Sequence, residues 1–253
     1  MIPKEDYMIV LQPVVPMRAE ASDCSEMVSQ MLFGDSCQVL QRTEGWYRVR
    51  TCFDGYLGWV NPKQLTPVTD ADVELLKTRF WIAQEAVVPV DVDETYQMML
   101  PMGAMVPDGT VSIAGHTYRA LRGIGESAPG MAAYATRLMG APYLWGGKTL
   151  MGVDCSGLVQ VAARCSGFTL PRDASQQASW GKLVPLSEAV RNDLCFFSND
   201  SGMIIHVGIY LGDGEILHAS GDVHIDLLDD KGIYSEKYGR YTHRLHSVKR
   251  LVG

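Results

Sequence analysis

The chain is 253 residues long, which is enough for one large domain or for two or three small ones. Hydrophobic residues make up 47% of it and charged residues 20%, a composition typical of folded globular proteins and not of disordered chains. The formal net charge is −7 and the pI is about 5.3, which argues against a nucleic-acid-binding surface. No apolar run is long enough to insert into a membrane.

The N-terminus has neither the basic start nor the apolar core of a signal peptide. If Met1 is the native start, we expect the protein to be cytoplasmic. If a leader was removed, a periplasmic or secreted protein is expected instead.

Between about residues 8 and 66, short runs of strand-forming residues are separated by turns that contain glycine. This pattern predicts five short strands in a small, curled antiparallel barrel. The strands are expected at 7–11, 28–32, 36–41, 46–51 and 57–60. A short helix with acidic residues in its first turn is expected at 70–80, and a second β-rich stretch follows at 81–122.

After Gly125 the pattern changes to helices followed by strands, which is typical of an α+β domain. One helix is expected at 129–139 with Ser127 as its N-cap, and another at 155–165. Strands are expected at 194–197, 206–211, 216–219 and 244–252. The predicted organisation is therefore a first barrel at 1–68, a connecting helix at 69–80, a second barrel at 81–125 and an α+β domain at 126–253.

The six cysteines show neither a disulfide framework nor the CxxC pairs of a zinc site. Five of them are interpreted as small buried apolar residues: Cys24, Cys37, Cys52, Cys165 and Cys195. Cys155 differs, because it lies where a glycine-rich loop meets the start of a predicted helix. Free N–H groups and the helix dipole stabilise negative charge there, so we expect a lowered thiol pKa and a nucleophilic thiolate.

The glycines around Cys155 are expected to let a substrate backbone approach closely. The alternative interpretation of the string Asp154-Cys155-Ser156-Gly157 is a turn before a core helix that carries a buried cysteine.

Two histidines provide a candidate base for this thiol. His206 begins an alternating strand, and His218 lies on the return strand of a hairpin that turns at 212–214. Such residues are opposite or diagonal neighbours across the ladder, roughly 5–8 Å apart. One histidine could accept the thiol proton while the second histidine fixes the tautomer of the first. The alternative is that both are ordinary histidines in a hairpin. Gly208 is expected to leave space for a docking helix.

The remaining histidines are interpreted as surface or satisfied polar residues: His116, His224, His243 and His246. Zinc would accept cysteine and histidine ligands, yet structural zinc usually draws on closely spaced pairs. The 51-residue separation of Cys155 and His206 favours a nucleophile and a base over chelation. We therefore expect no metal and no cofactor.

Residues from about 126 to 250 resemble the NlpC-type cell-wall peptidases, which have a papain-like core. The matching segments, in order, are YLWGG at 143–147, GVDCSGLV at 152–159, LPRDASQQ at 170–177, DLCFF at 193–197, HVGIYL at 206–211 and LHAS at 217–220. The one departure noted, Cys195, replaces a residue that is often glycine or apolar in the family.

The N-terminal part resembles bacterial SH3-like domains at 45–49 (GWYRV) and 54–60 (DGYLGWV). The second barrel is matched only by composition and position. Together these resemblances imply an α+β protein in which two small SH3-like β-barrels precede a papain-like catalytic domain. That arrangement is similar to the γ-D-glutamyl-L-diamino acid endopeptidases of the dipeptidyl-peptidase VI type.

The resemblance implies a role for each matching residue. Cys155 would attack the γ-amide carbonyl, His206 would protonate the leaving amine, and His218 would hold His206. The Tyr143 hydroxyl and the Cys155 N–H would stabilise the oxyanion, typically by ~3 kcal/mol per donor. Asp154 would bind a substrate ammonium and Ser156 would hydrogen-bond the peptide.

Four further residues are implied in substrate binding. Arg172 and Asp173 would form a pocket in which Arg172 pairs with a substrate carboxylate, with a solvated surface pair as the alternative. Glu26 and Tyr56 of the first barrel would close the site. The Glu26 carboxylate would then pair with the ammonium of L-Ala, with an exposed surface acid as the alternative.

The expected activity is hydrolysis of the bond between γ-D-Glu and the diamino acid in murein peptides that have a free N-terminal L-Ala. The expected partners are murein-derived peptides, with no nucleic acid and no membrane insertion. Whether the diamino acid is diaminopimelate or lysine is left open, as is the oligomeric state. The alternatives are a secreted hydrolase of intact peptidoglycan, a non-catalytic peptidoglycan-binding protein and, more distantly, amidase or acyl-transfer chemistry on lipids. The complete set of Cys155, His206 and His218 favours an enzyme, because binding alone gives no reason to keep all three.

Overall fold

A computed structural model describes residues 6–122 and 130–252, and the chain divides into two compact units, residues 1–127 and 128–253. Among the described residues, no helix is both long and apolar enough to cross a membrane. The combination of β-rich N-terminal structure with a mixed C-terminal unit confirms the predicted α+β fold class.

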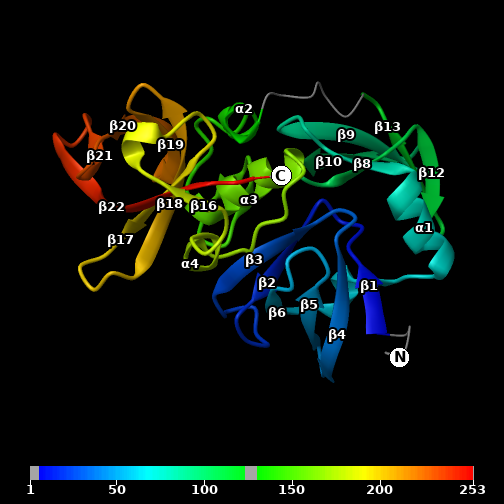
Figure 1. The fold of residues 1–253 in the computed structure, drawn as a ribbon. Helices are drawn as coiled ribbons and strands as arrows, with labels where there is room; N and C mark the ends of the chain where they lie inside the picture. The colour runs from blue at the N-terminus through cyan, green and yellow to red at the C-terminus, as the bar shows by residue number, and fades with distance from the viewer. Residues whose placement is uncertain (1–5, 123–129, 253) are drawn as a thin grey trace. The chain divides into compact units, whose positions relative to one another are not determined.

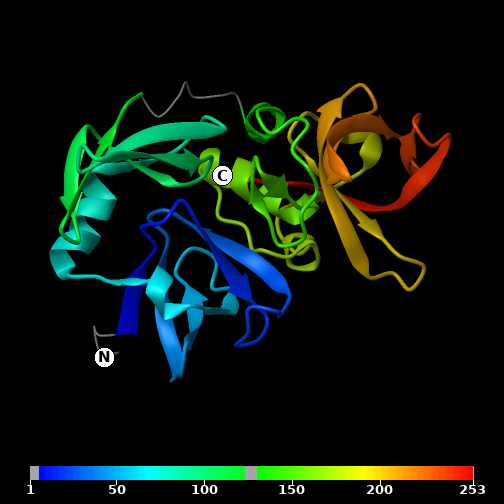
Figure 2. The same cartoon turned by 180° about the vertical axis from the view of Figure 1, so that it is seen from behind.

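The first part of the N-terminal unit is a seven-stranded antiparallel sheet that curls on itself (Figures 1 and 2). Its strand order is β3-β2-β6-β5-β4-β1-β7. The strands are β1 (Tyr7–Ile9), β2 (Val14–Arg18), β3 (Met27–Leu32), β4 (Ser36–Thr43), β5 (Trp46–Thr51), β6 (Leu57–Val60) and β7 (Thr66–Pro67), with a 3₁₀ turn η2 (Pro62–Gln64) before the last. Alternate residues such as Val15, Met17 and Val49 point inward and form its core.

Strand β2 is absent from the sequence-based prediction, because Pro13 and Pro16 disrupt the strand pattern there. In the structure β2 pairs with β3 along its length but meets β6 only through Arg18 and Trp59. Pro16 therefore needs no ladder partner on its second side, which is where proline is tolerated in sheets.

Helix α1 (Asp70–Thr78) links this sheet to the second β-rich part. Thr69 and Asp72 form a capping box at its start. The helix ends two residues before the predicted end, because Phe80 is buried at the beginning of a strand. The second part contains β8 (Phe80–Ile82), β9 (Val87–Val92), β10 (Tyr96–Pro101), β11 (Met105–Pro107), β12 (Thr110–Ile113) and β13 (His116–Ala120).

These six strands form a sheet of order β10-β9-β13-β12 and a separate β11-β8 pair. The second part shares an apolar core with the first. Phe33, the residue directly after β3, packs against Phe80 and Tyr118 with ring centroids 6.4 and 5.1 Å away. Residues 1–127 are therefore held together as one unit by side chains from both parts.

The C-terminal unit is built on a seven-stranded sheet of order β16-β22-β17-β18-β19-β20-β21. Strand β22 also pairs with β21, which closes the last six strands into a ring (Figure 1). The strands are β14 (Lys148–Thr149), β15 (Gly152–Val153), β16 (Lys182–Val184), β17 (Leu194–Ser198), β18 (Ile204–Gly212), β19 (Glu215–Ser220), β20 (Asp222–Leu228), β21 (Gly232–Ser235) and β22 (Arg240–Arg250). Of these, β14 and β15 form a separate two-stranded sheet.

The helices of this unit precede most of its strands in the chain. They are α2 (Met131–Thr136), α3 (Cys155–Cys165) and α4 (Ala174–Gln177), with a 3₁₀ turn η3 (Leu186–Glu188). Helix α3 has the predicted bounds and packs against β18, β19 and α2. Helix α2 is shorter than predicted and begins after Gly130, whereas the expected N-cap Ser127 lies outside the described residues.

Three of the five cysteines interpreted as buried are buried: Cys37, Cys165 and Cys195. The interpretation is wrong for Cys24 and Cys52, which are exposed. Both lie in turns just outside strands, where the sequence alone does not separate a buried from an exposed thiol.

The glycines around Cys155 allow the protein backbone, and not only a substrate, to pack closely. A Cβ atom at Gly157 would lie 2.2 Å from the carbonyl oxygen of Gly147, and one at Gly147 would lie 2.4 Å from that of Gly152. The loop can approach the first turn of α3 only because these side chains are absent. This close approach accounts for the glycines without the substrate contact expected from the sequence.

A Gly157→Ala substitution tests this packing through the sign of the change in the free energy of unfolding. Helix propensity alone predicts an increase of up to ~1 kcal/mol in that free energy, because alanine is the better helix former. We expect a loss of about 1–3 kcal/mol instead, because the new methyl group would overlap a backbone oxygen that cannot rotate away. Thermal unfolding of the two proteins measures the difference, and a stabilised variant would contradict the close packing.

Candidate active site

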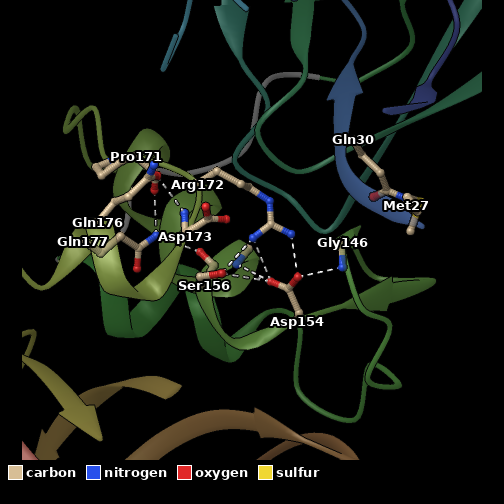
Figure 3. Close-up of polar contacts among 11 residues, drawn as sticks. Met27, Gln30, Gly146, Asp154, Ser156, Pro171, Arg172, Asp173, Gln176 and Gln177 are labelled. Carbon is tan, nitrogen blue, oxygen red and sulfur yellow. Dashed lines mark hydrogen bonds and ion pairs between the residues drawn. The ribbon is translucent and has the colours of Figure 1, made fainter. Parts of the chain in front are cut away.

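The start of α3 is organised around the carboxylate of Asp154, which is its N-cap (Figure 3). Its Oδ1 accepts the Gly157 N–H at 2.7 Å and its Oδ2 accepts the Gly146 N–H at 2.7 Å. One oxygen therefore satisfies the helix terminus while the other holds the glycine-rich loop against it. This arrangement determines where the next residue, Cys155, is placed.

Arg172 completes this arrangement from a buried position. Its Nη1 and Nη2 donate to the two Asp154 oxygens at 3.0 and 2.5 Å, and Nη1 also donates to Ser156 Oγ at 2.7 Å (Figure 3). The side chain of Gln177 ties the same segment to α3 through the Ser156 and Pro171 carbonyls, at 3.0 and 2.9 Å.

Asp154, Ser156 and Arg172 were expected to contact the substrate, but here they contact one another. The fork of Arg172 binds Asp154 and not a free carboxylate, and the alternative of a solvated surface pair is wrong because Arg172 is only 2% exposed. The Asp154 carboxylate receives five donors, counting the Ser156 hydroxyl at 3.3 Å, so its acceptor sites are filled. We therefore assign Asp154, Ser156 and Arg172 to positioning the nucleophile, and their expected contacts with substrate stay predictions.

Asp173 begins the short helix α4, where it forms a capping box with Gln176. Its side chain is half-buried, and it follows directly after Arg172 in the chain. Its proposed contact with substrate stays a prediction.

The Cys155 thiol is buried at the first position of α3. Burial, followed by the nearby charge of Asp154, raises its pKa from 9.0 to about 11. The N–H groups of Val207 and Ser156 lower the pKa but do not outweigh burial. The expected lowering of the thiol pKa is therefore wrong for this structure, in which the thiol keeps its proton until a base removes it.

Tyr143 lies close enough to Cys155 and Asp154 for their charges to affect its ionisation. Burial, followed by these two charges, raises the pKa of the phenol to about 12. The hydroxyl therefore remains protonated across the neutral range and is able to donate a hydrogen bond, as an oxyanion donor must.

The two histidines of the predicted hairpin are in direct contact. In the β18–β19 ladder Gly208 is opposite His218, which makes His206 its diagonal neighbour, and His206 Nε2 lies 2.9 Å from His218 Nδ1. Both rings are buried, and burial lowers the pKa of each, that of His206 to well below 6.5. Because Val207 presents its N–H to the Cys155 thiol, β18 also brings this histidine pair to the nucleophile.

A fourth group extends the chain of contacts beyond His218. The Asp226 carboxylate of β20 lies 3.4 Å from His218 Nε2. Burial raises the pKa of Asp226, but hydrogen bonds from His218 and His224 outweigh that effect and lower it, so the carboxylate is ionised and only accepts.

This polarity fixes both tautomers. His218 Nε2–H donates to Asp226, which leaves His218 Nδ1 to accept the His206 Nε2–H. The lone pair of His206 is then on Nδ1, the nitrogen that does not face His218. A neutral imidazole in this tautomer can accept the proton of a thiol.

Asp226 is absent from the residues predicted for the site, and two histidines predicted elsewhere belong to it. His243 stacks on His206 with ring centroids 4.1 Å apart, and His224 lies 4.6 Å from His218. They belong to the same cluster and are not isolated surface residues. The available signal was the alternation of Asp222, His224 and Asp226 along one strand, β20, which was not predicted. His116 pairs with Asp93, and His246 is exposed.

The space at Gly208 also has a different use from the one expected. A Cβ atom there would lie 2.7 Å from Ile216 Cδ1 and 3.0 Å from His218 Cβ. The missing side chain therefore makes room for residues of the neighbouring strand, including His218 itself, and not for a docking helix.

Glu26 and Tyr56 belong to the N-terminal unit, whereas the nucleophile belongs to the other. Glu26 is exposed beside β3, and Tyr56 is half-buried against the core of the first barrel. Their roles at the substrate site stay predictions.

The buried histidines predict a loss of stability in mild acid. Burial lowers the pKa of His206, His218 and His243 in the folded protein, that of His243 from 6.5 to about 4. The unfolded chain therefore binds more protons below pH 6.5, so this stability is fully present above pH 6.5 and is lost as the pH falls toward 4.

Urea unfolding at pH 7.5 and pH 5 measures this loss. A His243→Phe variant keeps a stacked ring without the titrating group and is expected to show a smaller decrease than wild type. Replacing the exposed His246 by Phe is the matched control. Equal decreases in all three proteins would contradict the role assigned to His243.

Comparisons with known proteins match both units. The NlpC/P60 family profile matches residues 140–243, and the bacterial dipeptidyl-peptidase SH3 domain profile matches residues 17–65. A γ-D-glutamyl-L-lysine dipeptidyl-peptidase of Bacillus subtilis is 29% identical over 252 residues, which cover 86% of this chain and 84% of the relative. The peptidoglycan endopeptidase RipB of Mycobacterium tuberculosis is 42% identical, but over 33% of this chain and 39% of its own.

The fold is similar to that of a solved NlpC/P60 family protein from Bacillus cereus. The two share 18% sequence identity and a TM-score of 0.80, over 98% of this chain and 100% of the other. The likeness confirms the papain-like fold of the C-terminal unit and the SH3-like character of the N-terminal β region. The chain is therefore a cysteine peptidase with an NlpC/P60 domain, matched at residues 140–243, behind a bacterial SH3 domain, matched at residues 17–65.

Proposed function

We propose that the protein hydrolyses the bond between γ-D-Glu and the diamino acid in murein peptides that carry a free N-terminal L-Ala. The observation that carries the chemistry is the 2.9 Å contact between His206 and His218, on a strand whose Val207 N–H faces the Cys155 thiol. A nucleophile, a base and a group that orients the base are the three components of this type of acyl transfer.

In the first half of the reaction, Cys155 Sγ attacks the γ-carbonyl carbon while its proton passes to Nδ1 of His206. The raised thiol pKa makes this transfer part of the attack, because no thiolate accumulates beforehand. The oxyanion accepts hydrogen bonds from the Tyr143 hydroxyl and the Cys155 N–H, each typically worth ~3 kcal/mol. His206 then gives its proton to the leaving amine of the diamino acid, and a thioester remains.

In the second half, a water molecule gives its proton to His206 and attacks the thioester carbon. Collapse of this intermediate releases the L-Ala-γ-D-Glu acid and returns the proton to the sulfur. In both halves His218, hydrogen-bonded to Asp226, accepts from His206 Nε2, so the proton-accepting nitrogen of His206 is Nδ1.

The choice of substrate is supported by the extent of similarity. The Bacillus subtilis relative, whose name specifies a γ-D-glutamyl-L-lysine bond, matches across both units, whereas RipB matches over about a third of this chain. We infer that the SH3 domain contributes to selection of the peptide, with Glu26 and Tyr56 recognising the L-Ala end.

A product analysis tests the reaction. We expect L-Ala-γ-D-Glu-diaminopimelate to give L-Ala-γ-D-Glu and free diaminopimelate by mass spectrometry, and we expect the N-acetylated peptide to react at least tenfold more slowly. The lysine-containing peptide, run in parallel, identifies the preferred diamino acid. A Cys155→Ala variant should have no activity, and undiminished hydrolysis would reject the nucleophile.

A second variant tests the amine-recognition role of Glu26. Removing a charged partner of the substrate ammonium should raise KM for the free peptide by about 10–100-fold and leave the slow reaction of the acetylated peptide unchanged. Glu20→Ala, an exposed acid in the same unit, is the control. Equal losses on both peptides would show that Glu26 does not read the amine.

A further inference from the structure

Three side chains on neighbouring strands bring metal-ligating atoms together beside the catalytic pair. Asp226 Oδ2 lies 3.4 Å from His218 Nε2 and 3.2 Å from His224 Nε2. Each of the three residues offers one ligand atom, and these ligand atoms all lie within 4.8 Å of one another. A tetrahedral ion with bonds of about 2.0–2.1 Å separates its ligands by roughly 3.3 Å. Two of the three separations therefore already match those of a tetrahedral zinc site.

The other ring nitrogens of His218 and His224, both Nδ1, also have hydrogen-bond partners. His224 Nδ1 lies 2.7 Å from Asp222 Oδ1, and His218 Nδ1 lies 2.9 Å from His206 Nε2. Histidines that bind metals generally have their other ring nitrogen bound to a carboxylate or a similar group, which aims the lone pair at the ion. This outer layer of contacts is present for both histidines.

The backbone holds the set in place and leaves it open to solvent. His218 and His224 are directly opposite in the β19–β20 ladder, and Asp226 lies two residues further along the same face of β20. The His224 side chain is 32% exposed and that of Asp226 is 10% exposed. An ion can thus reach the site from solvent and keep a water molecule as its fourth ligand.

We propose that His218, His224 and Asp226 form a binding site for a divalent transition-metal ion such as Zn²⁺, and that the bound ion inhibits the peptidase by reversing the tautomers of His218 and His206. Two neutral imidazoles and one carboxylate are ligands that zinc prefers. The site differs from the cysteine–histidine chelate considered from the sequence, because it uses neither Cys155 nor His206.

The inhibition follows from proton positions and rests on the proposed roles of Cys155 and His206. A metal ion on His218 Nε2 displaces the proton that Asp226 accepts, and this proton leaves to solvent. Neutral His218 then carries its proton on Nδ1, which it receives from His206 Nε2, and His206 takes up one proton from solvent on Nδ1. The nitrogen that should accept the thiol proton is now protonated, so the attack cannot begin.

A competing set in the same cluster consists of His206, His218 and His243. In this set His206 Nε2 and His218 Nδ1 are 2.9 Å apart and hydrogen-bonded, so an ion between them would replace that bond. That separation is shorter than the edge of a tetrahedral zinc site, and the three rings lack a carboxylate among them. The set that includes Asp226 is therefore favoured.

Metal binding is measured first, without substrate. Titration of the full chain with Zn²⁺ by calorimetry, and with Co²⁺ by visible absorption, is carried out in a Cys24→Ser/Cys52→Ser background, because these thiols are exposed. We expect one ion per chain, a cobalt spectrum without a thiolate band, and an affinity at least 100-fold weaker in His224→Asn. Asp222→Asn should weaken binding about 10–100-fold. His246→Asn and Cys155→Ser should bind like the parent.

Three binding results would overturn the proposal. Loss of the ion in Cys155→Ser would place it on the nucleophile, and loss in His243→Asn with retention in His224→Asn would place it in the competing set. Absence of binding at micromolar zinc would remove the site altogether. None of these readings depends on the substrate, so failure of the proposed peptide reaction would leave them intact.

Inhibition is measured second, with each variant compared with its own rate in the presence of a chelator. Zinc should inhibit the parent and His246→Asn at least tenfold, and His224→Asn should need at least tenfold more zinc for the same effect. Binding without inhibition would show that the ion does not reverse the tautomers. Equal sensitivity of the parent and His224→Asn would show that inhibition arises elsewhere.

Discussion

The carboxylate of Asp154 is the group on which the geometry of the peptidase unit depends. It caps α3, holds the Gly146 loop and pairs with the buried guanidinium of Arg172. Removing one partner of a buried ion pair typically costs 3–5 kcal/mol, because the other charge is left unpaired. The nucleophile is the first residue after this carboxylate, so the same contacts that stabilise the loop also set the position of the sulfur.

Two requirements of the active site conflict: shielding from water and the ionisation of its reactive groups. The nucleophile must be shielded from water for its chemistry, yet burial of a thiol and of an imidazole each favours the neutral form. Both effects are present here: burial raises the pKa of Cys155 and lowers the pKa of His206. The orientation of the hydrogen bonds offsets this effect. Asp226 can only accept a hydrogen bond, so His218 donates to it and accepts from His206 Nε2, which leaves His206 Nδ1 unprotonated.

Local patterns predicted the parts of the site that lie close together in the sequence. The bounds of α3, the placement of Cys155 at its start and the diagonal contact of His206 with His218 follow from capping, hydrophobic period and hairpin spacing. The environment of the thiol did not follow, because the pKa depends on how deeply the strands bury it. Asp226, His224 and His243 were missed because their positions depend on two strands, one unpredicted, that pair with distant parts of the chain.

The hairpin that joins β18 and β19 contains an irregularity between Tyr210 and Gly212, just before Asp213 with its positive φ of 52°. Side chains alternate between the two faces of a sheet, so His206 meets His218 only while the number of residues between them keeps its present parity along the ladder. A single inserted or deleted residue in this turn would send one of the two rings to the opposite face. In a lineage of such proteins, length variation at this turn should therefore be rare or come with a compensating bulge, even though residues 212–214 carry none of the catalytic side chains.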